Sequence, residues 1–491
     1  MGKVASQSIQ TTIFSYIGVV IGYFNVLWLY PYALEAAQLG TFRTIQDLGL
    51  LFVPFAQLGL GHGITRYFPK LDKGQSAFLS FSLLLACLGF LLVSTLFYVF
   101  REQVIGLFSK NSPDVINYLW IVLMITFLAL ANSILDAYSR SYLKVAIPAF
   151  FREVLLRLLT GLWILSFLGG WIDFDQLMAG LILVYGIPLL GMLIYLIWLK
   201  VLRIDLNWSN FPSGFRSSFL KFSLITFLAT AASTLILKID SIMVSSMVSL
   251  EANAIYTIAF SMALVIEMPR RAISQVVMPV IADHFSKNEI SQINLLYKHV
   301  SRRQLYICLL LFIGIWANID SIYHFIPNRE IYENGKWVVL FIGIGKLCDV
   351  AFSINGEILV FSNYYRFNLI ATVLMSGMII ALNYLLIPIY GIEGAAIASA
   401  LVMLFFNLTK FVFLRVKLRL SPFDWQTLMI LLSGLLVLFI VQFVPMMENP
   451  LAAMGIKSIL ILGFYVGLAT LGIAGKEELS WIRQKIRKSG S

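Results

Sequence analysis

Apolar runs as long as a membrane span alternate with short polar segments along almost the whole chain. A helix needs about 20 apolar residues to cross the hydrocarbon core of a bilayer, so each run is long enough to form one spanning helix. None of the runs alternates apolar and polar residues with a period of two, which excludes a transmembrane β-barrel. The pattern predicts about fourteen helical spans, at residues 9–32, 41–64, 76–100, 115–138, 146–169, 175–199, 218–246, 253–281, 304–326, 337–361, 367–389, 393–414, 426–445 and 451–474.

The composition supports a membrane protein. Of the 491 residues, 59% are hydrophobic and 12% are charged, and the mean hydropathy is +0.87. Soluble proteins carry about a quarter charged residues, so a soluble enzyme, a disordered chain and a nucleic-acid-binding module are excluded. Residues 1–13 contain one lysine and lead into the first apolar run without a small-residue cleavage pattern. We interpret them as part of the first span and not as a signal peptide.

The lysines and arginines between the spans predict the orientation of the chain. If the N-terminus is cytoplasmic, most of them lie on the cytoplasmic side, as the positive-inside rule requires. The tail adds Lys476, Arg483, Lys485, Arg487 and Lys488 to that side. The opposite side keeps Arg101, Lys110, Arg329, Lys336 and Lys457. The number of spans is therefore even and both termini are cytoplasmic, so the net charge of +11 reports topology and not a nucleic-acid partner.

Weak internal repeats recur at one common offset. The tripeptide LEA at residues 34–36 returns at 250–252, and the same offset pairs Arg203 with Arg419. Parallel repeats of this kind are related by an axis along the membrane normal. We therefore expect an all-α polytopic membrane protein with two six-helix lobes, 1–205 and 206–420, related by pseudo-two-fold symmetry. Residues 421–491 add two further helices and the basic tail.

Four short segments resemble a known family. They are residues 221–224 (KFSL), 238–243 (KIDSIM), 254–256 (AIY) and 390–398 (YGIEGAAIA). They look like the corresponding segments of bacterial polysaccharide flippases of the Wzx type. These flippases belong to the multidrug/oligosaccharidyl-lipid/polysaccharide exporter superfamily. The resemblance extends over the whole chain in length, span count and charge layout.

The resemblance implies a function in the cytoplasmic (inner) membrane of a bacterium. It implies a flippase, and not an enzyme, that carries an undecaprenyl-diphosphate-linked oligosaccharide by alternating access. Such an oligosaccharide is the repeat unit of an O-antigen (lipopolysaccharide), a capsule or an exopolysaccharide. The resemblance further implies coupling to a Na⁺ or H⁺ gradient, no other cofactor, and a monomer. The expected partners are the lipid-linked oligosaccharide, membrane lipids, and the polysaccharide polymerase and chain-length machinery, with no nucleic acid.

Ionisable residues deep inside spans are the candidate site residues, because a charge costs several kcal/mol in hydrocarbon unless it faces a partner or a wet cavity. The cations are candidates for binding the substrate. They are Arg270, Arg271, Lys346, Arg157, Arg43 and Lys238. The carboxylates are candidates for ion coupling. They are Asp349, Asp240 and Asp47.

The strongest of these candidates are Arg270 and Arg271, which follow Pro269 in the eighth predicted span. A proline bends a helix and frees a carbonyl, and arginine forks bind phosphate oxygens bidentately. The alternative is that both arginines snorkel to the head groups. Lys346 and Asp349 are three residues apart and share a helical face. They either neutralise each other or line a cavity.

Two further groups have equally open interpretations. Arg157 lies four residues after Glu153, a spacing that predicts an ion pair on one helical face. Arg43 and Asp47 lie one turn apart in the second span, while Lys238 and Asp240 are too close in sequence to face each other. Partners in the other half of the chain are therefore expected for Lys238 and Asp240. The alternative for all four is anchoring at the membrane interface.

Competing functions remain open at this point. A lipid II flippase is close to the leading interpretation. A multidrug/cation antiporter of the same superfamily is disfavoured because the first span contains no acidic residue. A membrane-embedded glycan polymerase, ligase or glycosyltransferase needs a large catalytic loop, and the longest predicted loop, residues 282–303, is too short. The four histidines show no metal-ligand spacing, so we expect no metal site and no catalytic residue.

Overall fold

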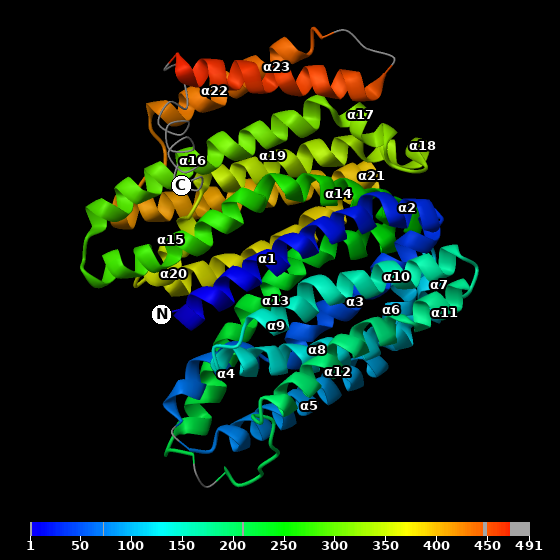
Figure 1. Cartoon of the computed structure of the whole chain (residues 1–491), viewed down its shortest axis with the longest axis vertical. Coiled ribbons are helices and arrows are strands. Elements are labelled where there is room, and N and C mark those ends of the chain that lie inside the picture. The colour runs from blue at the N-terminus through cyan, green and yellow to red at the C-terminus, as the bar shows by residue number, and fades with distance from the viewer. Residues whose placement is uncertain (1, 72, 209–210, 445–448, 472–491) are drawn as a thin grey trace. The chain divides into compact units, whose positions relative to one another are not determined.

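The computed structural model describes residues 2–71, 73–208, 211–444 and 449–471. These residues form helices joined by turns, and no strand occurs among them (Figure 1). The basic tail, Lys476, Arg483, Lys485, Arg487 and Lys488, lies outside the described residues. The chain divides into two compact units, residues 1–254 and 255–491.

The first unit contains thirteen helices in its described residues. They are α1 (Gly2–Phe24), α2 (Tyr30–Ala33), α3 (Ala36–Gln57), α4 (Leu60–Tyr67), α5 (Gln75–Val99), α6 (Arg101–Phe108), α7 (Asp114–Asn117), α8 (Leu119–Ser141), α9 (Ala146–Ala149), α10 (Leu156–Leu168), α11 (Phe174–Ala179), α12 (Leu181–Trp198) and α13 (Phe215–Met247). π-helical turns, Asn25–Leu29 and Phe150–Leu155, connect α1 to α2 and α9 to α10. Helix α8 packs against α3, α4, α5 and α12, and α13 packs against α3 and α4.

The second predicted span is broken between α3 and α4, where the two helices meet at 48°. Leu58 and Gly59 at the break both have positive φ angles, 51° and 72°. A Cβ atom on Gly59 would lie 2.1 Å from the carbonyl oxygen of Ser223 in α13. Glycine is the residue that adopts this backbone conformation without strain. Gly59 therefore allows both the bend and the close approach of α13.

The second unit begins within α14 and contains the remaining helices. They are α14 (Leu250–Leu264), α15 (Met268–Ser286), α16 (Ile290–Ala317), α17 (Ile319–His324), α18 (Arg329–Tyr332), α19 (Lys336–Phe352), α20 (Asn355–Phe361), α21 (Tyr365–Leu418), α22 (Trp425–Val441) and α23 (Pro450–Thr470). Helix α19 packs against α16 and α21. Helix α21 reverses its course at Gly391, where φ is 58° and ψ is −132°, so it consists of two limbs.

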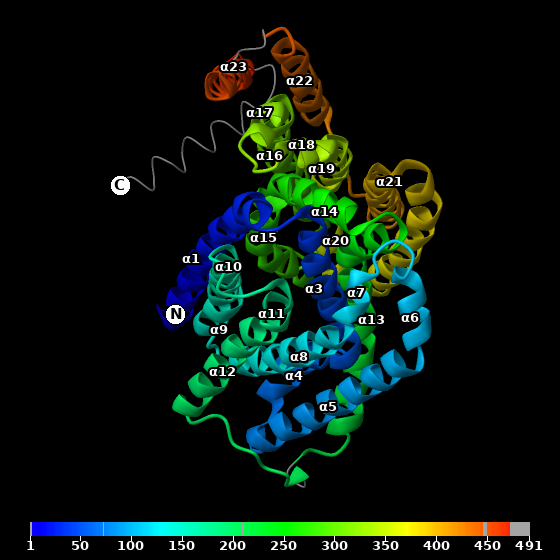
Figure 2. The same cartoon turned by 90° about the vertical axis from the view of Figure 1, so that its right-hand side faces the viewer.

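The two C-terminal helices pack against α16 of the same unit (Figure 2). Asp424 caps the start of α22 by accepting a hydrogen bond from the backbone N–H of Thr427. Tyr465 in α23 donates a hydrogen bond of 2.7 Å to the carbonyl oxygen of Tyr306 in α16. The two tyrosine rings are in contact, with their centroids 4.4 Å apart and their planes tilted by 32°. Helix α23 is therefore held to α16 by polar as well as apolar contacts.

The described helices agree with the predicted fold class. Nine are long and apolar enough to cross a membrane, and eleven spans result if each of two bent pairs counts as one. The 54-residue α21 covers two predicted spans, one on each side of Gly391. The shorter apolar helix α22 covers another, and α9, α10 and the turn between them cover residues 146–168. An all-helical, multi-pass architecture is confirmed, and its helices account for the predicted spans.

The predicted lobes differ from the observed units in where they divide the chain. The repeat pattern divides it after residue 205, whereas the contacts divide it after residue 254. Helix α13 begins the second predicted lobe, yet it packs on α3 and α4 in the first unit. A sequence repeat reports which segments resemble each other, whereas contacts report which segments pack together. The division into two six-helix lobes therefore stays a prediction.

Candidate functional site

A cluster of charged side chains is buried in the second unit, where α14 gives way to α15. The chain makes a short 3-10 turn, Val265–Glu267, and α15 then starts with Pro269 in its first turn. Proline is tolerated there because the first turn of a helix leaves its N–H groups unpaired. The predicted bend at Pro269 is thus a break between two helices, and it presents Glu267 and Arg270 to α19.

Glu267 joins two of the predicted cations. The Nζ atom of Lys346 lies 2.6 Å from Oε2 of Glu267, and Nε of Arg271 donates to Oε1 at 3.1 Å. Lys346 is only 2% exposed, whereas the side chain of Arg271 is 56% exposed. Lys346 is therefore enclosed in an ion pair. The guanidinium of Arg271 is largely accessible from outside the protein core.

Arg270 is surrounded by carboxylates. Its Nη1 atom lies 3.0 Å from Oδ2 of Asp349 and 3.8 Å from Oε1 of Glu267. Its Nη2 atom donates to the carbonyl oxygen of Ser353 at 3.1 Å and lies 4.0 Å from Oε1 of Glu357. A buried cation keeps its charge in such a place because paired groups offset its lost hydration. Arg270 therefore holds the end of α19 and the start of α20 together.

Of the two alternatives for Lys346 and Asp349, mutual neutralisation does not occur. The two residues share a helical face, but each pairs with a residue from the break between α14 and α15. A spacing of three places two side chains on the same face of a helix but does not force them to pair. Glu267 lies 2.6 Å from Lys346, and Arg270 lies 3.0 Å from Asp349. Tertiary contacts thus override the local spacing.

Three polar residues that sequence reasoning missed complete the cluster. Asn407 in α21 donates to Oδ1 of Asp349 at 3.0 Å and accepts from Asn355 at 2.9 Å. Lys410, one turn after Asn407, is 7% exposed, and its Nζ atom lies 3.7 Å from the centroid of the Phe406 ring. Among the described residues, no carboxylate lies within 4.0 Å of that ammonium. The sequence feature that could have identified this part of the cluster is the presence of two polar residues, Asn407 and Lys410, three positions apart in an otherwise apolar predicted span.

The cluster has an excess of positive charge. Its cations are Arg270, Arg271, Lys346 and Lys410, and its carboxylates are Glu267, Asp349 and Glu357. One cation therefore has no carboxylate of its own. An excess cation in a membrane span attracts an anionic group, because charge in hydrocarbon is stabilised by an opposite charge.

Two predicted residues of the first unit form an ion pair. Nζ of Lys238 in α13 lies 2.6 Å from Oδ1 of Asp47 in α3. The expected partner for Lys238 in the first half of the chain is therefore confirmed. Arg43, one turn before Asp47, has a buried Nε atom without a hydrogen-bond partner among the described residues. Asp240 is buried in α13.

Arg157 forms the predicted pair on its own helix. Its Nη2 atom lies 3.2 Å from Oε2 of Glu153, which confirms the pairing expected from their spacing. The backbone carbonyl of Arg157 accepts a hydrogen bond from Asn25 at 2.9 Å. A Cβ atom on Gly18 of α1 would lie 2.3 Å from the carbonyl oxygen of Glu153. Helix α1 thus closely covers this pair.

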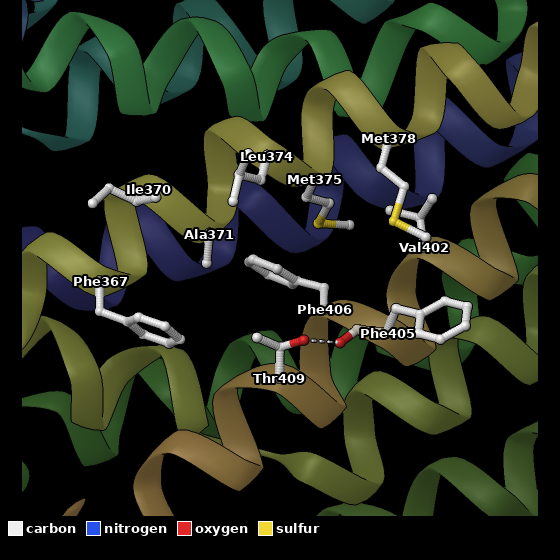
Figure 3. Close-up of a pocket in the computed structure, with 10 residues that line it drawn as sticks. All are labelled: Phe367, Ile370, Ala371, Leu374, Met375, Met378, Val402, Phe405, Phe406 and Thr409. Atoms are coloured by element: carbon white, nitrogen blue, oxygen red, sulfur yellow. Dashed lines mark hydrogen bonds between the residues drawn. The ribbon is translucent and has the colours of Figure 1, made fainter.

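An apolar pocket of about 160 Å³ lies between the two limbs of α21. Figure 3 shows Phe367, Ala371, Met375 and Met378 on one limb facing Val402 and Phe406 on the other. The hydroxyl of Thr409 turns back to donate to the carbonyl oxygen of Phe405 at 2.7 Å. The lining offers no charge, so the pocket suits a hydrocarbon chain and not a diphosphate or a sugar.

No metal centre is formed by the described residues. In that part of the chain, no group of three or more His, Cys, Asp or Glu side chains is arranged to hold a metal ion. The three cysteines, Cys87, Cys308 and Cys348, are free thiols. Arg270 lies 3.0 Å from Oδ2 of Asp349, so that oxygen already has a positively charged partner.

The sequence matches a known family over more than half of its length. Residues 6–285 match a family model described as polysaccharide biosynthesis protein. The chain belongs to this family. A comparison with curated proteins finds no match.

The fold of this polysaccharide biosynthesis protein is shared by solved transporters. A lipid II flippase, MurJ, in an inward closed conformation matches with a TM-score of 0.74 and 16% identity, over 94% of this chain and 98% of that one. An inward-facing MATE-family multidrug transporter matches with a TM-score of 0.63 and 14% identity, over 83% and 94% of the two chains. A MOP superfamily transporter from Pyrococcus furiosus matches with a TM-score of 0.55 and 14% identity, over 85% and 95%.

These comparisons confirm the family resemblance seen in the sequence. The chain is a multi-pass membrane protein of the polysaccharide biosynthesis protein family, and its fold is similar to that of the lipid II flippase and the multidrug transporters. The identities of 14–16% show the fold alone.

Proposed function

We propose that the protein flips an undecaprenyl-diphosphate-linked oligosaccharide from the inner to the outer leaflet of a bacterial cytoplasmic membrane. Its family supports a role in polysaccharide biosynthesis, and its fold supports transport. The observation that carries the proposal is the buried cluster around Glu267, in which four cations face three carboxylates. A membrane protein that carries a diphosphate needs such an excess of positive charge.

The chemistry of the lipid-linked oligosaccharide explains why the cluster needs its cations. Its lipid tail stays in hydrocarbon throughout, so only the diphosphate and the sugars need a polar route. Arg271 is the first group to contact the diphosphate, because its guanidinium is the most exposed cation of the cluster. Arginine presents parallel N–H groups that fit two phosphate oxygens at once. The bound phosphate then competes with Glu267 for Arg271.

Lys346 and Arg270 are proposed to act after Arg271. Glu267 holds both Arg271 and Lys346, so an anion bound to Arg271 lies next to this pair and can compete with Glu267 for Lys346 as well. Arg157, Arg43 and Lys238 are proposed to contact the head group in the first unit. Each cation that leaves its carboxylate gains a phosphate oxygen as its new partner. This contact offsets the cost of removing water from the diphosphate.

Ion coupling is proposed to act on the carboxylates of these pairs. Protonation of Asp349, or Na⁺ binding to it, would remove the negative charge that faces Arg270 at 3.0 Å. Asp47 would act in the same way on Lys238 at 2.6 Å, and Asp240 is the third candidate. Loss of such a pair frees two packed helices to separate, which is how an ion gradient drives alternating access.

The wider setting follows from this chemistry. We propose that the protein acts as a monomer with both termini cytoplasmic, without a cofactor other than the coupling ion. A lipid-linked repeat unit of an O-antigen, capsule or exopolysaccharide would be delivered to the polymerase and chain-length machinery outside the membrane. The described residues between spans offer no room for a soluble catalytic domain, which disfavours a polymerase or ligase.

Two transporters of the same fold are the competing candidates. The matches to multidrug transporters leave a larger share of this chain unmatched than the match to the lipid II flippase does. A cation exporter also needs a negatively charged site, and the cluster here has the opposite excess. A lipid-linked anion is therefore the better passenger for these residues.

The test is export by arginine variants in a strain from which the gene has been deleted. Arg271→Ala and Arg270→Ala are compared with Arg329→Ala, whose arginine forms an exposed pair with Glu333 at 2.8 Å. We expect the first two variants to accumulate lipid-linked oligosaccharide in the inner leaflet, Arg271→Ala at normal protein levels and Arg270→Ala after normalisation to the amount of folded protein, and Arg329→Ala to export normally. Leaflet-specific labelling of the glycan measures the distribution. Normal export by both cluster variants would remove this cluster from the site.

A further inference from the structure

A second cavity lies wholly within the first unit and is unlike the charged cluster. It measures about 420 Å³, within the range of about 300–1,000 Å³ that small-molecule sites occupy. Helices α3, α8 and α13 supply most of its walls, and the turn before α10, α10 itself and α12 close it. Its lining includes the polar residues Gln57, Asn132, Ser133, Asp136, Arg152 and Thr234 among apolar ones.

The charges of this cavity cancel. Asp136 and Arg152 are its charged lining residues, and Nη1 of Arg152 lies 3.0 Å from Oδ2 of Asp136. Behind the lining, Arg140 reaches Oδ2 of Asp136 at 3.3 Å, and Glu153 pairs with Nε of Arg152 at 3.0 Å and with Nη2 of Arg157 at 3.2 Å. The two charges that line the cavity are thus paired with each other, and both are held by further charged groups. The cavity therefore suits a neutral polar ligand.

Several polar groups in the lining are available to a ligand. Asn132 and Thr234 form no side-chain hydrogen bond within the described part of the chain. Both ion pairs of Asp136 use Oδ2, so Oδ1 remains an acceptor. Gln57 donates through Nε2 to Ser133 at 3.0 Å, which leaves its Oε1 atom as a second acceptor. The lining thus offers donors and acceptors side by side.

This mixture matches the hydroxyl groups of a sugar, because each hydroxyl both donates and accepts. A phosphate only accepts, so the acceptors Oδ1 of Asp136 and Oε1 of Gln57 would oppose it. The polar groups are also fixed in position before a ligand arrives. Ser133, which holds Gln57, donates in turn to the carbonyl oxygen of Leu130 at 2.7 Å, and two arginines hold Asp136.

We propose that this cavity binds one neutral sugar ring of the glycan through Asn132, Thr234, Gln57 and Asp136. The inference rests on the proposed flippase function and adds a sugar site in the first unit to the diphosphate site in the second. The diphosphate is common to all passengers of this kind, whereas the sugar differs from one to the next. The cavity is therefore where the protein selects its glycan.

Thermal unfolding of the purified full-length protein tests this proposal. The probes are glucose, galactose, rhamnose and N-acetylglucosamine, with sorbitol to correct for the general stabilising effect of polyols, and inorganic pyrophosphate as a separate ligand. We expect at least one sugar to raise the unfolding temperature by about 2–4 °C in a saturable manner, beyond sorbitol. Pyrophosphate is expected to stabilise the protein independently.

Two variants and one control locate the binding. Asn132→Leu and the nearly isosteric Thr234→Val should lose the sugar-dependent shift and keep the pyrophosphate-dependent shift. Ser233→Ala, next to Thr234 on an exposed face of α13, should keep both. Either variant that retains the full sugar shift overturns the assignment, and so does a wild-type protein that no sugar stabilises beyond sorbitol. The flippase proposal fails separately, if deletion of the gene leaves the lipid-linked oligosaccharide normally distributed between the two leaflets.

Discussion

Lys346 is 2% exposed in a predicted membrane span, and the carboxylate of Glu267 lies 2.6 Å from its ammonium. Neither residue could be buried there alone, because an unpaired charge in the low-dielectric interior is strongly destabilising. Glu267 also holds Arg271. The carboxylate is thus shared between a buried cation that stabilises the unit and an exposed cation that is free to meet a ligand.

Removing the charge of Glu267 should expose this dependence. Glu267→Gln leaves Lys346 buried without its partner, and we expect the free energy of unfolding to fall by about 3–5 kcal/mol. Glu267→Gln combined with Lys346→Met should recover much of the loss, because the buried ammonium that loses its carboxylate is then removed as well. Thermal unfolding of the two purified variants measures the difference. A double variant as unstable as Glu267→Gln would contradict the pairing.

Residue spacing predicted some contacts of these charges and missed others. The pair of Arg157 with Glu153 follows from one helical turn, and the structure contains it at 3.2 Å. The partners of Lys346 and Asp349 come from another helix, so no local rule could supply them. Lys410 belongs to the same cluster through the folded structure, because its neighbours Asp349 and Glu357 lie on other helices.

At the scale of helices, glycine and tyrosine determine how closely two elements approach. Gly59 lies at the 48° bend between α3 and α4, where α13 passes close to the backbone. Tyr306 and Tyr465 join α16 to α23. The bend and the tyrosine pair lie in different units, so their effects can be measured independently.

Gly59→Ala should destabilise the protein through two effects that a matched variant separates. Gly170 also has a positive φ angle, 71°, but a Cβ atom there meets nothing within 4 Å. We expect Gly170→Ala to lower the free energy of unfolding by about 1–3 kcal/mol from backbone strain alone. Gly59→Ala should cost more, because its Cβ would also collide with the carbonyl oxygen of Ser223. Equal unfolding temperatures for the two variants would count against a close approach of α13.

The hydroxyl of Tyr465 should matter more than that of Tyr306. Tyr465 donates to the carbonyl oxygen of Tyr306 at 2.7 Å, whereas the reverse bond is 3.4 Å long. Tyr465→Phe should therefore lower the free energy of unfolding by about 1 kcal/mol, and Tyr306→Phe by less. Protease sensitivity of the segment between α22 and α23 provides a second measurement. The reverse order of the two variants would show that α23 is held differently.

For the whole molecule, the distribution of basic residues predicts an orientation that labelling can test. After replacement of Cys87, Cys308 and Cys348 by serine, single cysteines are introduced as Lys110→Cys and Lys417→Cys. A membrane-impermeant maleimide added to intact cells should label only the first, because the second is expected in the cytoplasm. Labelling of the second in intact cells would reverse the topology. Permeabilised cells, in which both should react, serve as the control.

The linear pattern of apolar and charged residues was sufficient for the class of the protein, the positions of its spans and its family. These properties depend on the transfer of whole segments into lipid and on short motifs, both of which are local. The pairing of Lys346 with Glu267, the enclosure of Arg270 and the neutral cavity around Asn132 were not readable in that way. Each depends on side chains that come from different helices, and close packing of a folded unit is what brings them within a few ångströms of one another.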